Sequence, residues 1–135
     1  MIFVVENENE LIDKVWQEIG NDIAPGKIFG LQGDLGAGKT TLVKGIAKKL
    51  GLKEEITSPT YLIEKDYSNG LRHIDLYRFE KPSKIDKNEA MEWLDNKTGP
   101  TFIEWPEKIP EVSKQLDIKV ILKNLGENKR EVEIK

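Results

Sequence analysis

The stretch GDLGAGKT, residues 33–40, decides the fold expected for this chain. It matches the pattern G-x-x-x-x-G-K-[ST] at every defined position. Glycines allow positive φ angles, so several backbone N–H groups can turn to one side and form a cradle for an anion. Lys39 supplies a charge for the β- and γ-phosphates, and the Thr40 hydroxyl is a ligand for Mg²⁺. The stretch therefore predicts a nucleotide-phosphate site.

The segments on either side have the periodicity that such a loop needs. KIFGLQ (27–32) has the apolar character of a short strand, and an apolar stripe over about 39–50 predicts an amphipathic helix that Gly51 ends. The helix N-terminus then adds N–H donors and a favourable dipole to the anion cradle. A chance match in this length has odds of about one in a few hundred. The context favours a binding loop over a glycine-rich turn that binds nothing.

Short apolar and amphipathic segments alternate along the rest of the chain. An Asn-Gly pair at 69–70 is typical of a hairpin. The patterns predict helices over 8–20 and 84–94, and strands over 2–5, 61–67, 71–77, 101–105, 116–122 and 129–134. We therefore expect an α/β fold, a single P-loop NTPase-type domain spanning 1–135, with a mixed sheet flanked by helices and a C-terminal antiparallel hairpin.

Composition excludes several kinds of chemistry. The 135 residues include no cysteine, which removes thiol nucleophiles, disulfides and Cys-ligated metals, and one histidine, His73, which removes metal sites with two His ligands. The formal net charge of −3, from 21 basic and 24 acidic residues, argues against a dedicated nucleic-acid binder. No apolar run is long enough for a membrane span, and no secretory signal is visible. These features indicate a cytoplasmic protein.

Acids at strand ends are the next candidates, because a nucleotide site needs them to hold Mg²⁺ and orient water. Asp75 lies in the run 71–78, and Glu104 ends the apolar run 101–104. Thr60 follows a proline in the loop after the phosphate-loop helix, where a GTPase places its Mg²⁺-sensing threonine. Each acid has the alternative interpretation of a solvated strand end.

Other residues remain open between a site role and a structural one. His73 is either a packed or exposed strand histidine or a site group, and Trp105 either fills the core or contacts the nucleotide pocket or a partner. Arg78 is a phosphate ligand or one half of a surface ion pair. Four lysines near the phosphate-loop helix form a solvated face or a docking patch for a partner or RNA: Lys44, Lys48, Lys49 and Lys53.

Three functions compete on these residues alone. The GTPase motifs are missing, because no DxxG follows a later strand and Gly99 stands where guanine recognition requires Asp. A small-molecule kinase usually needs an arginine-rich lid, whereas the chain has only Arg72, Arg78 and Arg130. An ATPase and a nucleotide-sensing switch without significant turnover share every binding residue, so only measured hydrolysis separates them.

Four motifs in order resemble one family closely. They are GDLGAGKTT (33–41), SPTY (58–61), HIDLYR (73–78) and IEWPE (103–107). Together they make the chain similar to the TsaE family, the small ATPases of bacterial tRNA threonylcarbamoyladenosine synthesis. The resemblance covers nearly the whole chain, and the last three motifs are specific to this family.

The resemblance implies ATP or ADP with Mg²⁺ as cofactors and slow hydrolysis of ATP. It implies TsaB and TsaD as partners, with tRNA contacted only indirectly, and TsaD modifies N6 of adenosine 37. It also implies that Thr40 and Glu104 serve the metal, while Asp75, Glu104 and Thr60 are catalytic. The nucleotide-binding residues that follow are Asp34, Gly36, Ala37, Gly38, Lys39, Thr40, Thr41 and Trp105. No membrane or DNA role is expected.

Overall fold

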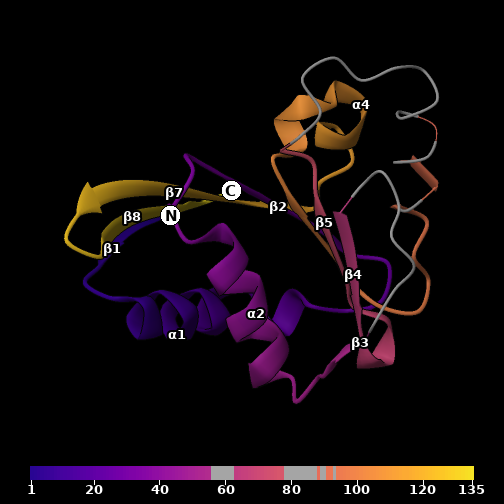
Figure 1. The fold of residues 1–135 in the computed structure, drawn as a ribbon, viewed down its shortest axis with the longest axis horizontal. Coiled ribbons are helices and arrows are strands. Elements are labelled where there is room, and N and C mark those ends of the chain that lie inside the picture. The colour runs from indigo at the N-terminus through magenta and orange to yellow at the C-terminus, as the bar shows by residue number, and fades with distance from the viewer. Residues whose placement is uncertain (56–62, 78–87, 89–90, 93) are drawn as a thin grey trace.

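A computed structural model of the chain describes residues 1–55, 63–77, 88, 91, 92 and 94–135. The strands in these residues form one eight-stranded sheet with the order β1-β8-β7-β2-β6-β5-β4-β3 (Figure 1). The four central strands, β7, β2, β6 and β5, are parallel, and the outer pairs are antiparallel. The strands are β1 (Ile2–Val5), β2 (Ile28–Gly33), β3 (Glu54–Glu55), β4 (Ile63–Tyr67), β5 (Arg72–Asp75), β6 (Thr101–Glu104), β7 (Ile118–Gly126) and β8 (Lys129–Ile134). The predicted mixed sheet is confirmed.

Two long helices lie together on one side of the sheet, and a short one lies at the other end of the molecule (Figure 1). They are α1 (Glu8–Ile19), α2 (Lys39–Lys49) and α4 (Pro110–Ser113), and 3₁₀ turns cover Gly20–Asp22, Ser68–Gly70 and Pro106–Lys108. Of the helix predicted over 84–94, residues 88, 91, 92 and 94 are described and are helical. The rest of that prediction lies outside the described residues. No helix among the described residues has the length and apolar character to cross a membrane.

Local signals explain where α1 and α2 begin and end. The Asn7 side chain caps α1 by accepting a hydrogen bond of 2.9 Å from the backbone N–H of Glu10. Gly51, with φ +71°, follows the last turn of α2 in the left-handed conformation that stops many helices. Both ends agree with the amphipathic segments that the sequence predicts.

The sheet separates two apolar clusters, because side chains alternate between its faces. Phe29 and Phe102, on neighbouring strands, stack with ring centroids 4.7 Å apart and pack with the buried faces of α1 and α2. Ile103, the next residue along β6, belongs to the other cluster, which includes Ile109 and Val112 from the α4 region. Helices thus cover both faces, as an α/β fold requires.

The C-terminal hairpin is confirmed but is longer than predicted. β7 continues to Gly126 instead of ending at Leu122, and its register is irregular between Asn124 and Gly126. Glu127 and Asn128 form the turn with φ angles of 47° and 69°, as a two-residue type I′ turn requires. β8 then pairs with β1, so the two ends of the chain lie side by side (Figure 1).

Candidate functional site

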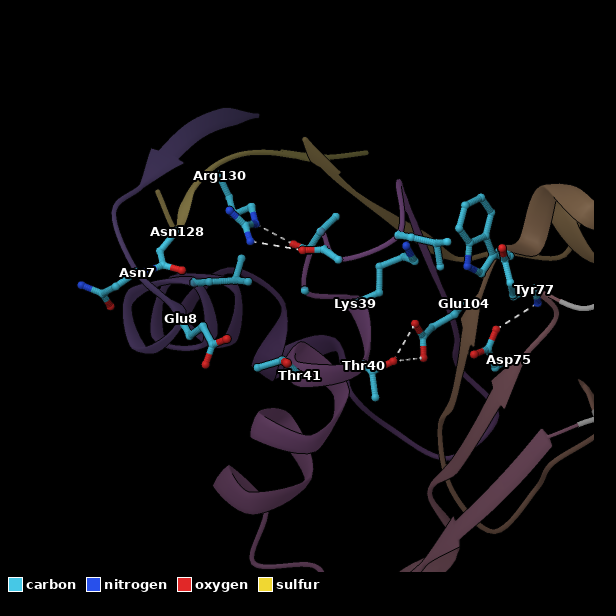
Figure 2. A pocket seen from close by; sticks show the side chains of 16 residues that line it. Asn7, Glu8, Lys39, Thr40, Thr41, Asp75, Tyr77, Glu104, Asn128 and Arg130 are labelled. Carbon is cyan, nitrogen blue, oxygen red and sulfur yellow. Dashed lines mark hydrogen bonds between the residues drawn. The ribbon is translucent and has the colours of Figure 1, made fainter. Parts of the chain in front are cut away.

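A cleft opens at the carboxyl ends of the central strands, where α/β sheets commonly bind ligands. Its volume is about 380 Å³, within the range of small-molecule sites. Figure 2 shows the lining side chains, which come from the loop after β2, from β5 and β6, and from both ends of the chain. The lining residues are Asn7, Glu8, Leu11, Leu35–Thr41, Asp75, Tyr77, Glu104, Trp105, Asn128 and Arg130.

The loop 33–40 forms one wall of this cleft. Gly36 and Gly38 have φ angles of 78° and 106°, which a side chain rarely adopts, and Gly38 begins α2. Lys39 bends back over the loop, where its Nζ donates to the carbonyl oxygens of Gly33 (2.5 Å) and Asp34 (2.8 Å). Burial lowers the pKa of Lys39, although the carboxylates of Glu104 and Asp75 oppose the shift. The ammonium thus sits within the loop that its charge would serve.

Glu104 is the most constrained acid in the cleft. Its side chain is buried, and the Thr40 hydroxyl lies 2.9 and 2.8 Å from its two carboxylate oxygens. The Nε2 atom of His73 lies 2.6 Å from Oε2. Burial by itself would raise the pKa of Glu104, but the hydrogen bond and the electrostatic attraction of His73, with the Thr40 bond and Lys39, lower it. Glu104 therefore stays ionised and points at the start of α2.

Asp75 is the neighbour of Glu104 across the β5–β6 pair. Its Oδ1 accepts a hydrogen bond of 2.9 Å from the backbone N–H of Tyr77. Burial raises the pKa of Asp75, and the nearby negative charge of Glu104 adds to this effect. Two carboxylates with opposite pKa shifts thus stand side by side in one cleft, which is a common sign of distinct roles.

Trp105 follows Glu104 in the chain and also lines the cleft. Its φ and ψ angles of 60° and 47° are left-handed, which is a genuine outlier for a bulky side chain. The indole ring lies 4.4 Å from Lys39 Nζ and 5.3 Å from the ring of Tyr77, measured to the centroids. The first contact has the geometry of a cation–π interaction with the phosphate-loop lysine.

Arg130, on β8, reaches the phosphate loop from the opposite side (Figure 2). Its Nε donates to the carbonyl oxygen of Ala37 (2.9 Å) and its Nη2 to that of Gly36 (3.2 Å). A side chain 93 positions from Ala37 in the sequence thus holds the loop.

The comparisons with known proteins identify the family. A family model described as "Threonylcarbamoyl adenosine biosynthesis protein TsaE" matches residues 6–132. The chain belongs to the TsaE family. It is 36% identical to the tRNA threonylcarbamoyladenosine biosynthesis protein TsaE of Nostoc, over 98% of this chain and 83% of that protein. It is 34% identical to the protein of the same name from Aquifex aeolicus, over 97% and 92%.

Solved structures agree with the assignment of the fold. A crystal structure of YdiB from Bacillus subtilis superposes with a TM-score of 0.62 and 25% identity, covering 98% of this chain and 82% of that one. The α/β fold of this TsaE-family chain is therefore shared with a protein known from experiment.

The structure of this TsaE-family chain brings most of the predicted site residues together. Gly36, Ala37, Gly38, Lys39, Thr40, Thr41, Asp75, Glu104 and Trp105 all line the cleft. Asp34 contributes its backbone carbonyl to Lys39 rather than lining the cleft. Thr60 and Arg78 lie outside the described residues, so their predicted roles stay predictions. The lysines at 44, 48, 49 and 53 are exposed, and Lys49 pairs with Asp13 at 2.7 Å.

Sequence reasoning missed the side of the cleft made by the chain ends. Asn7, Glu8 and Leu11 come from the start of α1, whereas Asn128 and Arg130 come from the hairpin. They meet because β1 pairs with β8, and no local motif announces that pairing. For His73 the sequence left two interpretations open, a packed residue and a site residue. Both apply, because the side chain is buried and its Nε2 atom contacts the Glu104 carboxylate.

Thr40 and Glu104 supply oxygen donors of the kind that Mg²⁺ prefers. Their mutual contact places both within reach of one ion, and the lowered pKa of Glu104 keeps it anionic. The described part of the chain holds no group of three or more His, Cys, Asp or Glu side chains that could bind a metal. Mg²⁺ usually takes one or two protein ligands and completes its shell with phosphates and water, so the pair fits that ion.

Proposed function

We propose that this chain binds ATP with Mg²⁺ and hydrolyses it slowly, as a component of the machinery that forms N6-threonylcarbamoyladenosine at position 37 of tRNA. One observation carries the ATPase part: a complete phosphate loop lies against a buried, ionised glutamate, with the Thr40 hydroxyl 2.8 Å from Glu104. Membership of the TsaE family supports the place of this activity in tRNA threonylcarbamoyladenosine biosynthesis.

In this proposal Lys39 and the loop amides bind the phosphates. Lys39 exchanges its bonds to the Gly33 and Asp34 carbonyls for phosphate oxygens, which stabilise its charge more strongly. Thr40 and Glu104 would hold Mg²⁺, which would supply positive charge against the charge that develops on the phosphoryl group. Asp75 orients the attacking water, and its raised pKa suits it to receive a proton from that water.

The partners in this proposal are TsaB and TsaD, with tRNA contacted only through the complex. The net charge of −3 supports an indirect role, because nucleic-acid binding is dominated by neutralisation of phosphates with basic groups. The cytoplasmic location expected from the sequence stays a prediction.

The experiment measures ATP hydrolysis by the purified chain, alone and with TsaB and TsaD. We expect low turnover alone and stimulation by the pair, together with a complex on size-exclusion chromatography. Lys39→Ala should lose nucleotide affinity, whereas Glu104→Ala should lose turnover more than binding, because a metal-site acid acts mainly on the transferring phosphoryl group. Lys44→Ala is the matched control, since Lys44 is an exposed lysine on the same helix.

Two other results would change the conclusion. Binding of ATP without hydrolysis, alone or with partners, would replace the ATPase by a nucleotide-sensing switch. Phosphorylation of an added small acceptor would replace it by a kinase, which the described arginines do not favour. Arg72 pairs with Asp66 at 3.3 Å, and Arg130 is bound to the phosphate loop, so neither stands in an arginine-rich lid.

A further inference from the structure

We propose that Arg130 is a positioning residue for the phosphate loop, which fixes the direction of the Gly38 N–H for binding a nucleotide phosphate. The inference rests on the proposed function, because it assigns a role within nucleotide binding. It concerns the second half of the loop, Gly36 to Gly38. The two hydrogen bonds of Lys39 go to the first half, to Gly33 and Asp34.

The guanidinium of Arg130 donates hydrogen bonds both to the phosphate loop and to the β7–β8 hairpin. Its Nε and Nη2 donate to two successive loop carbonyls, those of Ala37 at 2.9 Å and Gly36 at 3.2 Å. Its Nη1 donates to the Asn124 side chain and the Lys129 carbonyl, both at 3.0 Å. These four hydrogen bonds employ all but one of the five N–H groups of an arginine. The side chain thereby joins the loop to the hairpin through protein acceptors on both.

Peptide geometry turns this clamp into an orientation of the loop. In a trans peptide the C=O and the following N–H point in opposite directions, and no cis peptide bond occurs among the described residues. Because the Ala37 carbonyl points at Arg130, the Gly38 N–H points to the opposite side. The Gly36 carbonyl likewise turns the Ala37 N–H away from Arg130, where it donates to Asp34 at 3.0 Å.

The loop needs such an external contact. Gly36 and Gly38 have positive φ angles and no side chain, so this part of the backbone has wide conformational freedom. Leu35, at the tip, is 64% exposed and adds little packing. When Lys39 turns to the phosphates, its bonds to Gly33 and Asp34 are lost. The bonds from Arg130 to the Ala37 and Gly36 carbonyls would then remain, in addition to the buried Ala37 side chain.

A competing role for Arg130 is that of a simple positive charge near the phosphates. Arg130→Lys distinguishes the two, since lysine keeps the charge but lacks the planar fork that reaches two carbonyls at once. Arg130→Met removes both the charge and the fork. Lys129→Gln is the matched control, because it removes an exposed charge from the preceding position of the same strand, where Lys129 lies 3.8 Å from Glu6.

Two measurements on each variant test the proposal. Calorimetric titration gives the affinity for Mg²⁺·ATP and for Mg²⁺·tripolyphosphate. NMR without nucleotide gives the chemical shift of the Gly38 amide and the hydrogen-exchange rate of the Ala37 amide. We expect Arg130→Lys and Arg130→Met each to weaken both ligands by about tenfold, the factor that corresponds to one hydrogen bond. The Gly38 amide resonance should shift in both variants, and the Ala37 amide, which donates to the Asp34 carbonyl, should exchange faster, while amides in β2 and α1 keep their rates. Lys129→Gln should behave as the parent chain.

Wild-type affinity and an unchanged Gly38 amide in Arg130→Lys would overturn the positioning role, and weak binding by Arg130→Met alone would then assign a purely electrostatic one. A loss of exchange protection throughout the sheet would instead show that Arg130 serves only general stability. Failure of the parent chain to bind ATP would contradict the proposed function, whereas the Gly38 amide would still report whether Arg130 orients the loop.

Discussion

The Thr40 hydroxyl contacts both carboxylate oxygens of Glu104, at 2.9 and 2.8 Å, although 64 positions separate the two residues in the chain. Thr40 belongs to the first turn of α2 and Glu104 ends the neighbouring strand β6. The contact joins the phosphate loop to the acidic edge of the sheet. Because the Glu104 side chain is buried, the carboxylate has few other ways to satisfy its charge.

Removing the Thr40 hydroxyl should disturb Glu104 before any nucleotide binds. We expect Thr40→Val to raise the pKa of Glu104 and to lower the free energy of unfolding by about 1–3 kcal/mol, because a buried carboxylate loses a donor. Chemical denaturation at neutral pH measures the loss. Thr40→Ser keeps the hydroxyl and should stay close to the parent chain. A Thr40→Val variant as stable as the parent chain would show that the hydroxyl contact does not stabilise the buried carboxylate.

His73 should act on turnover through the orientation of Glu104, since its Nε2 lies 2.6 Å from that carboxylate. His73→Leu removes this contact and should lower kcat by about 10–100-fold with little change in KM, as for groups that orient a metal ligand. His73→Gln keeps an N–H donor at the end of a side chain of similar reach and should recover much of kcat. The ATPase rate as a function of ATP concentration separates the two constants. A kcat that Gln does not restore would argue against the hydrogen bond as the cause.

Asp75→Asn should make the protein more stable at neutral pH while it lowers ATP turnover. Burial raises the pKa of Asp75 above its ordinary value of 3.8, so the folded chain binds this proton more tightly than the unfolded chain. Stability therefore falls as pH rises from near 3.8 through the folded pKa, and this loss persists at higher pH. Asn has no charge to desolvate and keeps the oxygen that accepts from Tyr77.

The Tm difference between Asp75→Asn and the parent chain is the quantity to measure, from pH 7 downward. It should be positive at pH 7 and shrink as the pH approaches 3.8, where the unfolded parent also takes up its proton. A variant less stable than the parent at pH 7 would show that the ionised carboxylate is favoured in the fold.

At position 105 we expect the glycine variant to be more stable than the alanine variant, which inverts the usual order. Its backbone is left-handed, with φ 60°, a conformation that costs a residue with a side chain about 1–2 kcal/mol and costs glycine nothing comparable. Trp105→Gly should therefore be more stable than Trp105→Ala by about 1 kcal/mol, although both lose the indole contact with Lys39. Urea unfolding of the pair measures this difference. Alanine as the more stable variant would mean that the strain relaxes when the ring is removed.

Local sequence patterns determined the individual strands, helices and turns, because these elements form between residues that are close in the chain. The strand at 28–33, the glycine loop and the helix at 39–49 followed from periodicity and from the phosphate-loop pattern. Asp75 and Glu104 were located because acids at strand ends are needed beside such a loop, and the parallel β5–β6 pair indeed places them side by side. The hairpin at the C-terminus was found, but its first strand runs to Gly126, beyond the predicted end at Leu122, so that the turn is confined to Glu127-Asn128.

The sequence by itself thus determined the chemistry of the phosphate end of the cleft: an anion cradle, a lysine, a hydroxyl and two acids. Only the tertiary structure decided which distant groups complete it. The contact of His73 with Glu104 and that of Arg130 with the phosphate loop both depend on strand register. Register brings together positions that no local pattern relates. The physical reason is range: backbone propensity and periodicity act between neighbours in the chain, whereas the hydrogen bonds that orient this site join residues from opposite ends of it.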